Sequence, residues 1–300
     1  MCNIWRLSGN DKLSFTEIGQ IINALLKFKL ETVVLTGGEP LLHPEFLDIC
    51  KLLKKYKIKI ILVTNGILLE RFTFEVSRFV DQVVVSLDGG TAQVHDIIRG
   101  VTCFDKVLDG ICRLKDYLRS QKTKLKIRIR CTVQKRNFLY LAEVVNTAKA
   151  IGAGCVSFLP VDVTSVAFGR GRGERDVQAA NECNLSKDDL NIFKVTIGNL
   201  IESHIIDFKS GFIQENPKKL AQLYHYFDSL INKTDPLYPR CYAPWFSIVI
   251  ESDGAVLPCF FRPAFGDFRQ QPLEKILKSK QLSKVRADLK RQNSRECKQC

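Results

Sequence analysis

The chain has 300 residues, of which 45% are hydrophobic and 26% are charged, so it can bury a sizeable core and is not a disordered chain. No run of about 18 apolar residues and no apolar leader is found, so we expect a cytoplasmic protein that does not associate with membranes. The 45 Lys and Arg against 32 Asp and Glu give a net charge of +13, which would attract acidic partners but is also typical of solvated helix faces.

Between residues 14 and 160 the sequence alternates helix and strand patterns. Ser14 and Glu17 have the spacing of a capping box ahead of apolar residues on one helix face. Short apolar or alternating runs, separated by helical segments of ten or more residues, predict crossover connections and therefore a parallel sheet. The predicted strands are 31–36, 57–64, 81–87, 124–133 and 155–160, and the predicted helices are 14–28, 43–56, 68–80, 104–120 and 138–153.

This alternation ends after residue 160. Residues 161–186 contain the Gly/Arg stretch FGRGRGERD, which is typical of a loop. Ser186 and Asp189 then have the spacing of a second capping box, and amphipathic helices are expected from there to about residue 203 and over 217–232.

A domain boundary is expected near residue 235, where the sequence NKTDPLYP favours turns. It separates an α/β domain over 1–235 from a small cysteine-bearing α+β domain over 236–300. In the second domain, two extended runs around Ser252-Asp253-Gly254 predict a hairpin.

Polar residues follow three successive predicted strands. The sequences TGGEP, VTNG and SLDG place Glu39, Asn65 and Asp88 just after these strands. The carboxyl ends of parallel strands meet at one edge of a sheet, which is where α/β proteins bind ligands. Turn formation alone explains the glycines of these motifs but not the recurrence of the polar residues. We therefore expect a binding site at this edge.

The three motifs, in this order and spacing, resemble the core of the radical S-adenosylmethionine (radical SAM) enzymes. The resemblance implies a partial (β/α)6 TIM-like barrel. Members of this family hold a [4Fe-4S] cluster through three cysteines spaced C-x3-C-x2-C, and MCNIWRLS resembles the segment that carries the third. Cys2 is therefore the expected third ligand, and we expect a chain that lacks the first strand and the two other ligands.

The resemblance also implies which residues bind S-adenosylmethionine. The glycines of TGGEP and Glu39 would meet its amino group, Ser86 and Asp88 its ribose, and Asn65 the same rim. Arg130 would pair with its carboxylate, because arginine offers a planar fork; the alternation of Arg128 and Arg130 also fits an exposed sheet edge. The implied cofactor-binding residues are Gly37, Gly38, Glu39, Asn65, Ser86, Asp88 and Arg130.

Four cysteines near the carboxyl end form a second candidate site. Thiolates at these spacings can bind Zn²⁺ or an iron–sulfur cluster, and spacing alone does not decide. The pattern C-x12-G-x4-C, with Gly254 at the hairpin, resembles the SPASM or twitch domain, which implies one or two auxiliary [4Fe-4S] clusters. The expected metal ligands are Cys2, Cys241, Cys259, Cys297 and Cys300.

The resemblance implies an enzyme that reductively cleaves S-adenosylmethionine to a 5′-deoxyadenosyl radical, which abstracts a hydrogen from a substrate. A peptide, a protein or a small cofactor precursor is the expected substrate, and flavodoxin or ferredoxin is the expected electron donor. A chain without the two other cluster ligands is expected to be inactive on its own. Two alternatives stay open. One is a zinc-stabilised basic module that binds nucleic acid, and the other is a radical SAM enzyme acting on RNA.

Overall fold

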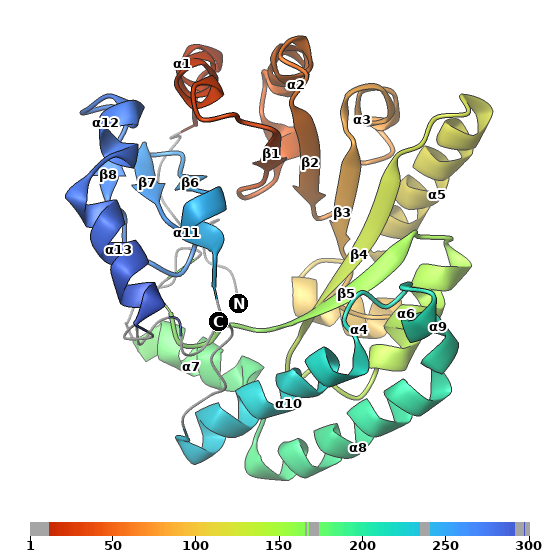
Figure 1. Ribbon diagram of the computed structural model, residues 1–300. Helices are drawn as coiled ribbons and strands as arrows, with labels where there is room; N and C mark the ends of the chain where they lie inside the picture. The colour runs from red at the N-terminus through yellow and green to blue at the C-terminus, as the bar shows by residue number, and fades with distance from the viewer. Residues whose placement is uncertain (1–11, 166, 168–173, 235–240, 292–296, 298–300) are drawn as a thin grey trace. The chain divides into compact units, whose positions relative to one another are not determined.

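The computed structural model describes residues 12–165, 167, 174–234, 241–291 and 297 (Figure 1). Contacts divide these residues into two compact units. One comprises 32–163 and 178–234, and the other comprises the described residues of 1–31, 164–177 and 235–300. The grouping places the amino-terminal helix with the carboxyl-terminal residues, which the expected domains 1–235 and 236–300 did not anticipate; that boundary stays a prediction.

The first unit is built on a five-stranded parallel sheet in the order β1-β2-β3-β4-β5. The predicted parallel sheet is confirmed, and all five predicted strands form. Their bounds are Thr32–Leu35, Lys59–Thr64, Gln82–Ser86, Lys126–Val133 and Cys155–Pro160. The connections contain η2 (Pro40–Leu42), α2 (Phe46–Lys55), α3 (Thr73–Phe79), α4 (Ala92–Arg99), α5 (Phe104–Ser120) and α6 (Leu141–Ala150).

The two faces of this sheet differ because successive side chains on a strand point to opposite sides. On one face, apolar side chains such as Ile60, Leu62 and Ile129 are fully buried, and helices α2, α3 and α5 lie along one side of the sheet (Figure 1). We call the other face the polar face. It carries Gln82, Ser86, Arg128, Arg130 and Ser157.

After β5 the chain forms α7 (Glu174–Cys183), α8 (Lys187–Ser203), α9 (Ile205–Lys209) and α10 (Pro217–Asn232). The capping box of Ser186 and Asp189 is confirmed. Between α9 and α10 the chain returns to β5, since Val156 N–H donates to Phe212 O at 2.8 Å and Gln214 N–H donates to Val156 O at 3.0 Å. Most of the Gly/Arg stretch lies outside the described residues, while its last residues begin α7.

The second unit packs α1 (Phe15–Leu26) with a three-stranded antiparallel sheet. The predicted hairpin is confirmed, as is the capping box of Ser14 and Glu17. Ile21 of α1 joins the apolar cluster of this unit with Val256 and Ile276, and Glu17 pairs with Arg269 at 2.7 Å. The remaining elements are α11 (Ala243–Phe246), β6 (Val249–Ile250), β7 (Ala255–Leu257), β8 (Gly266–Asp267), α12 (Leu273–Leu277) and α13 (Lys280–Lys290).

Within the described part of the chain, no helix combines the length and the apolar character needed to cross a bilayer. The nine cysteines that the structure describes all have free thiols.

Candidate active site

The loop after β1 presents bare backbone. Gly37 has a φ of 137°, a conformation that side chains other than glycine rarely adopt. A Cβ added at Gly37 or at Gly38 would meet no atom of the described residues within 4 Å. A ligand can therefore approach this backbone closely, as the predicted contact with the amino group of S-adenosylmethionine requires.

Glu39 ties the same loop to the end of β2. Its Oε2 accepts a hydrogen bond from Asn65 N–H at 2.8 Å, and its Oε1 accepts from Thr64 Oγ1 at 2.8 Å and from Leu41 N–H at 3.3 Å. Burial raises the pKa of Glu39, and these three hydrogen bonds oppose the rise. The carboxylate thus positions the bare glycine loop, whatever contact it makes with a ligand.

Three of the predicted residues lie in one row across the polar face. Ser86 on β3 pairs with Arg130 on β4, which pairs with Ser157 on β5. Asn65 extends the row, since the preceding residue Thr64 is the β2 partner of Val85. The alternative that Arg128 and Arg130 lie on an exposed edge of the sheet is wrong, because their strand, β4, lies between β3 and β5. Ser157 was not predicted as a site residue, because the sequence shows only that it lies two residues into a predicted strand.

Arg130 is held in a partly buried position. Its Nε is buried and meets no hydrogen-bond partner among the described residues. Burial lowers the pKa of Arg130, the neighbouring Arg128 lowers it further, and Glu215 raises it. Arg130 therefore retains donors for a ligand anion.

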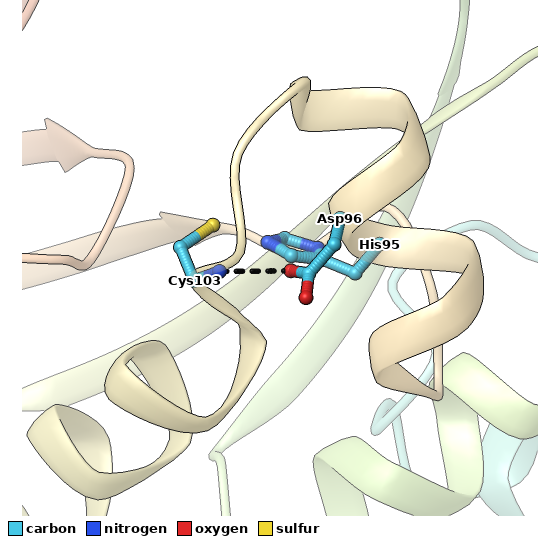
Figure 2. A group of neighbouring side chains, drawn as sticks. All are labelled: His95, Asp96 and Cys103. Carbon is cyan, nitrogen blue, oxygen red and sulfur yellow. Dashed lines mark hydrogen bonds between the residues drawn. The ribbon is translucent and has the colours of Figure 1, made fainter.

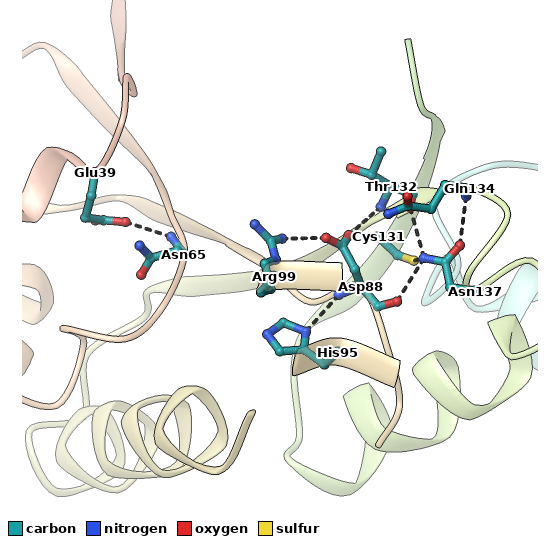
Figure 3. Close-up of polar contacts among 9 residues, drawn as sticks. All are labelled: Glu39, Asn65, Asp88, His95, Arg99, Cys131, Thr132, Gln134 and Asn137. Atoms are coloured by element: carbon teal, nitrogen blue, oxygen red, sulfur yellow. Dashed lines mark hydrogen bonds and ion pairs between the residues drawn. The ribbon is translucent and has the colours of Figure 1, made fainter. Parts of the chain in front are cut away.

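Asp88 lies at the centre of a buried polar network (Figure 3). Its side chain is 0% exposed. Its Oδ1 accepts from Thr132 N–H at 2.8 Å, and its Oδ2 lies 2.8 Å from Nη2 of Arg99. Its backbone N–H donates to Nδ1 of His95 at 3.1 Å, and its backbone oxygen accepts from Nδ2 of Asn137 at 2.8 Å. Burial raises the pKa of Asp88, and the charge of Arg99 opposes this.

Oδ1 of Asp88 is thus hydrogen-bonded within the protein, whereas Oδ2 is held by the charge of Arg99 and has no hydrogen-bond partner among the described residues. Its predicted contact with the ribose stays a prediction, and Arg99 is the charged group that Asp88 visibly positions. The Arg99 side chain is 21% exposed and lies between Asp88 and Glu39, and its charge lowers the pKa of Glu39 (Figure 3). Sequence analysis did not assign Arg99 or Asn137 to the site, because their contacts cross from α4 and from the turn after β4.

His95, Asp96 and Cys103 form a cluster whose candidate ligand atoms lie within 4.8 Å of one another (Figure 2). It does not suit a metal ion. Nδ1 of His95 accepts the Asp88 N–H, so the ring proton of the neutral imidazole is on Nε2 and blocks that nitrogen as a ligand. Oδ1 of Asp96 already accepts from the N–H groups of Cys103 and Phe104 at 3.0 and 2.9 Å, which caps α5. The cluster therefore stabilises the fold.

The second unit contains three of the predicted metal ligands. Cys241, Cys259 and Cys297 are each half-buried. Burial raises the pKa of the Cys259 thiol, and the charges of Cys297 and Cys241 raise it further. Backbone N–H groups of Phe261 and Arg262 point at the Cys259 sulfur. Mutually repelling thiolates with N–H donors suit an iron–sulfur cluster. Cys2 and Cys300 lie outside the described residues.

Comparison with known proteins agrees with this geometry. Residues 1–128 match the Radical SAM superfamily, and residues 241–300 match SPASM, an iron-sulfur cluster-binding domain. The chain is 25% identical over 278 residues to an AdoMet-dependent heme synthase of Methanosarcina barkeri, covering 88% of this chain and 73% of the relative. It is 26% identical over 261 residues to the antilisterial bacteriocin subtilosin biosynthesis protein AlbA of Bacillus subtilis, covering 85% of this chain and 50% of the relative.

Among solved structures, Streptococcus suis SuiB bound to the precursor peptide SuiA has a similar fold. The TM-score is 0.62 at 14% identity, over 96% of this chain and 64% of SuiB. The expected fold class, a partial barrel with a small cysteine-rich domain, is confirmed. The cofactors of these domains are [4Fe-4S] clusters and S-adenosylmethionine. The chain belongs to the radical SAM superfamily and carries a carboxyl-terminal SPASM domain.

Proposed function

We propose that this protein is a radical SAM enzyme that abstracts a hydrogen atom from a peptide substrate. The observation that carries the proposal is the bare backbone at Gly37 and Gly38, in the unit whose strand ends also carry the row of Ser86 and Arg130. When bound and reduced, the cluster and S-adenosylmethionine supply a 5′-deoxyadenosyl radical that removes this hydrogen atom.

The residues of the first unit bind and orient the cofactor. Gly37 and Gly38 offer backbone to its amino group, Arg130 offers a planar fork to its carboxylate, and Ser86 and Asn65 line the same row. Glu39 and Asp88 hold this arrangement in place, one through β2 and the other through Arg99. A primary radical attacks any nearby C–H bond, so fixed positions and exclusion of water decide which hydrogen is removed.

The cysteines of the second unit hold an auxiliary cluster in this proposal. Cys241, Cys259 and Cys297 are the described ligands, with Cys300 completing the set and Cys2 serving the cofactor-binding cluster. The auxiliary site binds the substrate or accepts the electron that remains after hydrogen abstraction. A cytoplasmic location with a flavodoxin or ferredoxin as electron donor suits a protein with this many free thiols.

A peptide substrate is favoured by the similarity to a bacteriocin biosynthesis protein over 85% of this chain. The net charge of +13 suits an acidic peptide. A second candidate is oxidation of a small cofactor precursor, which the similarity to a heme synthase over 88% of this chain favours.

The test is anaerobic reconstitution of the protein, followed by chemical reduction with S-adenosylmethionine present. We expect iron and sulfide to be incorporated and 5′-deoxyadenosine to form. The Arg130→Gln variant should bind the cofactor less tightly, whereas Arg113→Gln, on the exposed surface of α5, should behave as the wild type. Colourless protein that holds only zinc would overturn the proposal.

A further inference from the structure

Two arginines project from neighbouring positions of the polar face. Arg128 and Arg130 are two residues apart on β4, so their side chains share a face and their Cα atoms are about 6–7 Å apart along the strand. Arg130 is in the row of Ser86 and Ser157, nearer the carboxyl ends of the strands. Arg128 is one row further from those ends, beside Val84 and Cys155.

Gln82 holds one edge of the Arg128 guanidinium. In the amide orientation that satisfies both partners, the carbonyl oxygen of Gln82 accepts from Nε and Nη2 of Arg128, each at 3.1 Å. This leaves the edge formed by Nη1 and Nη2, which no acceptor in the described part of the chain satisfies. That edge presents two parallel N–H donors and can bind a carboxylate with two hydrogen bonds. The guanidinium is thus already oriented and still has a free fork.

The charges around this pair are unbalanced. The charge of Arg128 lowers the pKa of Arg130, and Glu215 is the acidic group whose charge opposes this. Glu215 is 7% exposed and accepts from Phe158 N–H at 3.1 Å, so its place beside β5 is fixed. The charge of Glu215 acts on Arg130 and not on Arg128, so the positive charge of Arg128 is left without a carboxylate partner among the described residues.

We infer that Arg128, oriented by Gln82, binds a carboxylate of the substrate peptide. This rests on the proposed function, in which Arg130 takes the carboxylate of S-adenosylmethionine and leaves Arg128 for a second anion. In a peptide, such a carboxylate comes from an acidic side chain or from the carboxyl terminus. The substrate is therefore a peptide that places a carboxylate at Arg128. This position is one row further from the carboxyl ends of the strands than Arg130, which binds the cofactor.

Three blocked tripeptides test this by calorimetry on the anaerobic, reconstituted full-length protein with S-adenosylmethionine present. They are acetyl-Gly-Glu-Gly-amide, acetyl-Gly-Gln-Gly with a free carboxyl terminus, and acetyl-Gly-Gln-Gly-amide. We expect one of the two carboxylate-bearing peptides to bind at least about tenfold tighter than the neutral one. Which of the two binds tighter identifies the source of the carboxylate.

Two variants locate the effect. Arg128→Gln removes the fork, and Gln82→Glu neutralises Arg128 in place, so each should abolish the preference; Gln82→Glu also serves if Arg128→Gln does not fold. Arg113→Gln is the matched control and should keep the preference. A preference that survives in Arg128→Gln, equal binding of all three peptides, or no binding to the wild type would overturn the inference.

Formation of 5′-deoxyadenosine is measured in parallel on the same protein. If it forms while the peptides bind equally, only the role of Arg128 is wrong. If it does not form in the wild type, the proposed function fails as well.

Discussion

The glycines at the strand ends fall into two groups with opposite surroundings. A Cβ added at Gly66 would lie 2.8 Å from Cγ1 of Val85, and one added at Gly89 would lie 2.5 Å from the backbone nitrogen of His95. Additions at Gly37 and Gly38 would meet no atom in the described part of the chain. The motifs look alike in sequence, but the protein packs against one group of glycines, whereas the other group borders space that the described residues do not fill.

The acidic residues of the same motifs divide in a similar way. Asp88 is 0% exposed and holds Arg99, His95 and Asn137 in a closed network. Glu39 is half-buried and anchors a loop whose backbone stays bare. The network around Asp88 therefore serves stability, and the loop anchored by Glu39 serves binding (Figure 3). Mutations in the two parts should affect these two properties separately.

The largest effect on stability is expected in the buried network around Asp88. Asp88→Ala leaves Arg99 without its buried partner and should lower the free energy of unfolding by about 3–5 kcal/mol. Anaerobic denaturant titration measures this. The double variant Asp88→Ala/Arg99→Met, compared with each single variant, should recover part of the loss, because it leaves no unpaired charge. Strictly additive effects of the two changes would contradict the coupling.

The pH dependence of stability tests the same network through His95. Burial, and secondly the charge of Arg99, lower the pKa of His95 from 6.5 to about 4. Between these values the unfolded chain binds a proton that the folded chain does not, so the free energy of unfolding should fall as the pH is lowered. We expect a loss of about 2 kcal/mol between pH 7 and pH 4.5. Unfolding titrations of His95→Gln, which keeps an acceptor but does not titrate, should lack this slope.

The ion pair of Glu17 and Arg269 in the second unit should contribute least to stability. A hydrogen bond from Arg269 and the capping hydrogen bond from Ser14 lower the pKa of Glu17 from 4.5 to about 2. Its contribution is present above pH 4.5 and lost as the pH falls towards 2. The pair is exposed to solvent, so a double-mutant cycle of Glu17→Gln and Arg269→Gln should give no more than about 1 kcal/mol. A coupling as large as that of Asp88 and Arg99 would remove the distinction between buried and exposed pairs.

Much of the first unit could be predicted from the sequence, because its strands are short apolar runs and its helices carry apolar residues at helical spacing. The periodicity did not reveal α4 and α7, which are short and polar. It also could not show that α1 packs with β7 and α12, since that contact joins segments more than two hundred residues apart.

The part of the candidate site that lies in one contiguous motif could be predicted. The contacts between residues that are separated in the sequence could not. Gly37 to Glu39 follow a strand directly, so their position at the sheet edge follows from the pattern. The charge that faces Arg130 comes from Glu215, and the cation that faces Asp88 comes from Arg99. Neither partner has a local signal, because the return of the chain to β5 brings Glu215 into place and the path of α4 brings Arg99 back to Asp88.

Binding of S-adenosylmethionine to Gly38→Ala tests most directly whether the bare part of the rim is a binding surface. Its new methyl group meets no atom of the described residues, so the fold should tolerate it, as it should in the control Gly198→Ala on α8, where a Cβ also meets none of them and where alanine should raise helix stability by about 0.5–1 kcal/mol. Calorimetry on the reconstituted protein should show cofactor affinity reduced about tenfold or more in Gly38→Ala alone, since the methyl group would separate ligand and backbone. Wild-type affinity in Gly38→Ala would contradict the account.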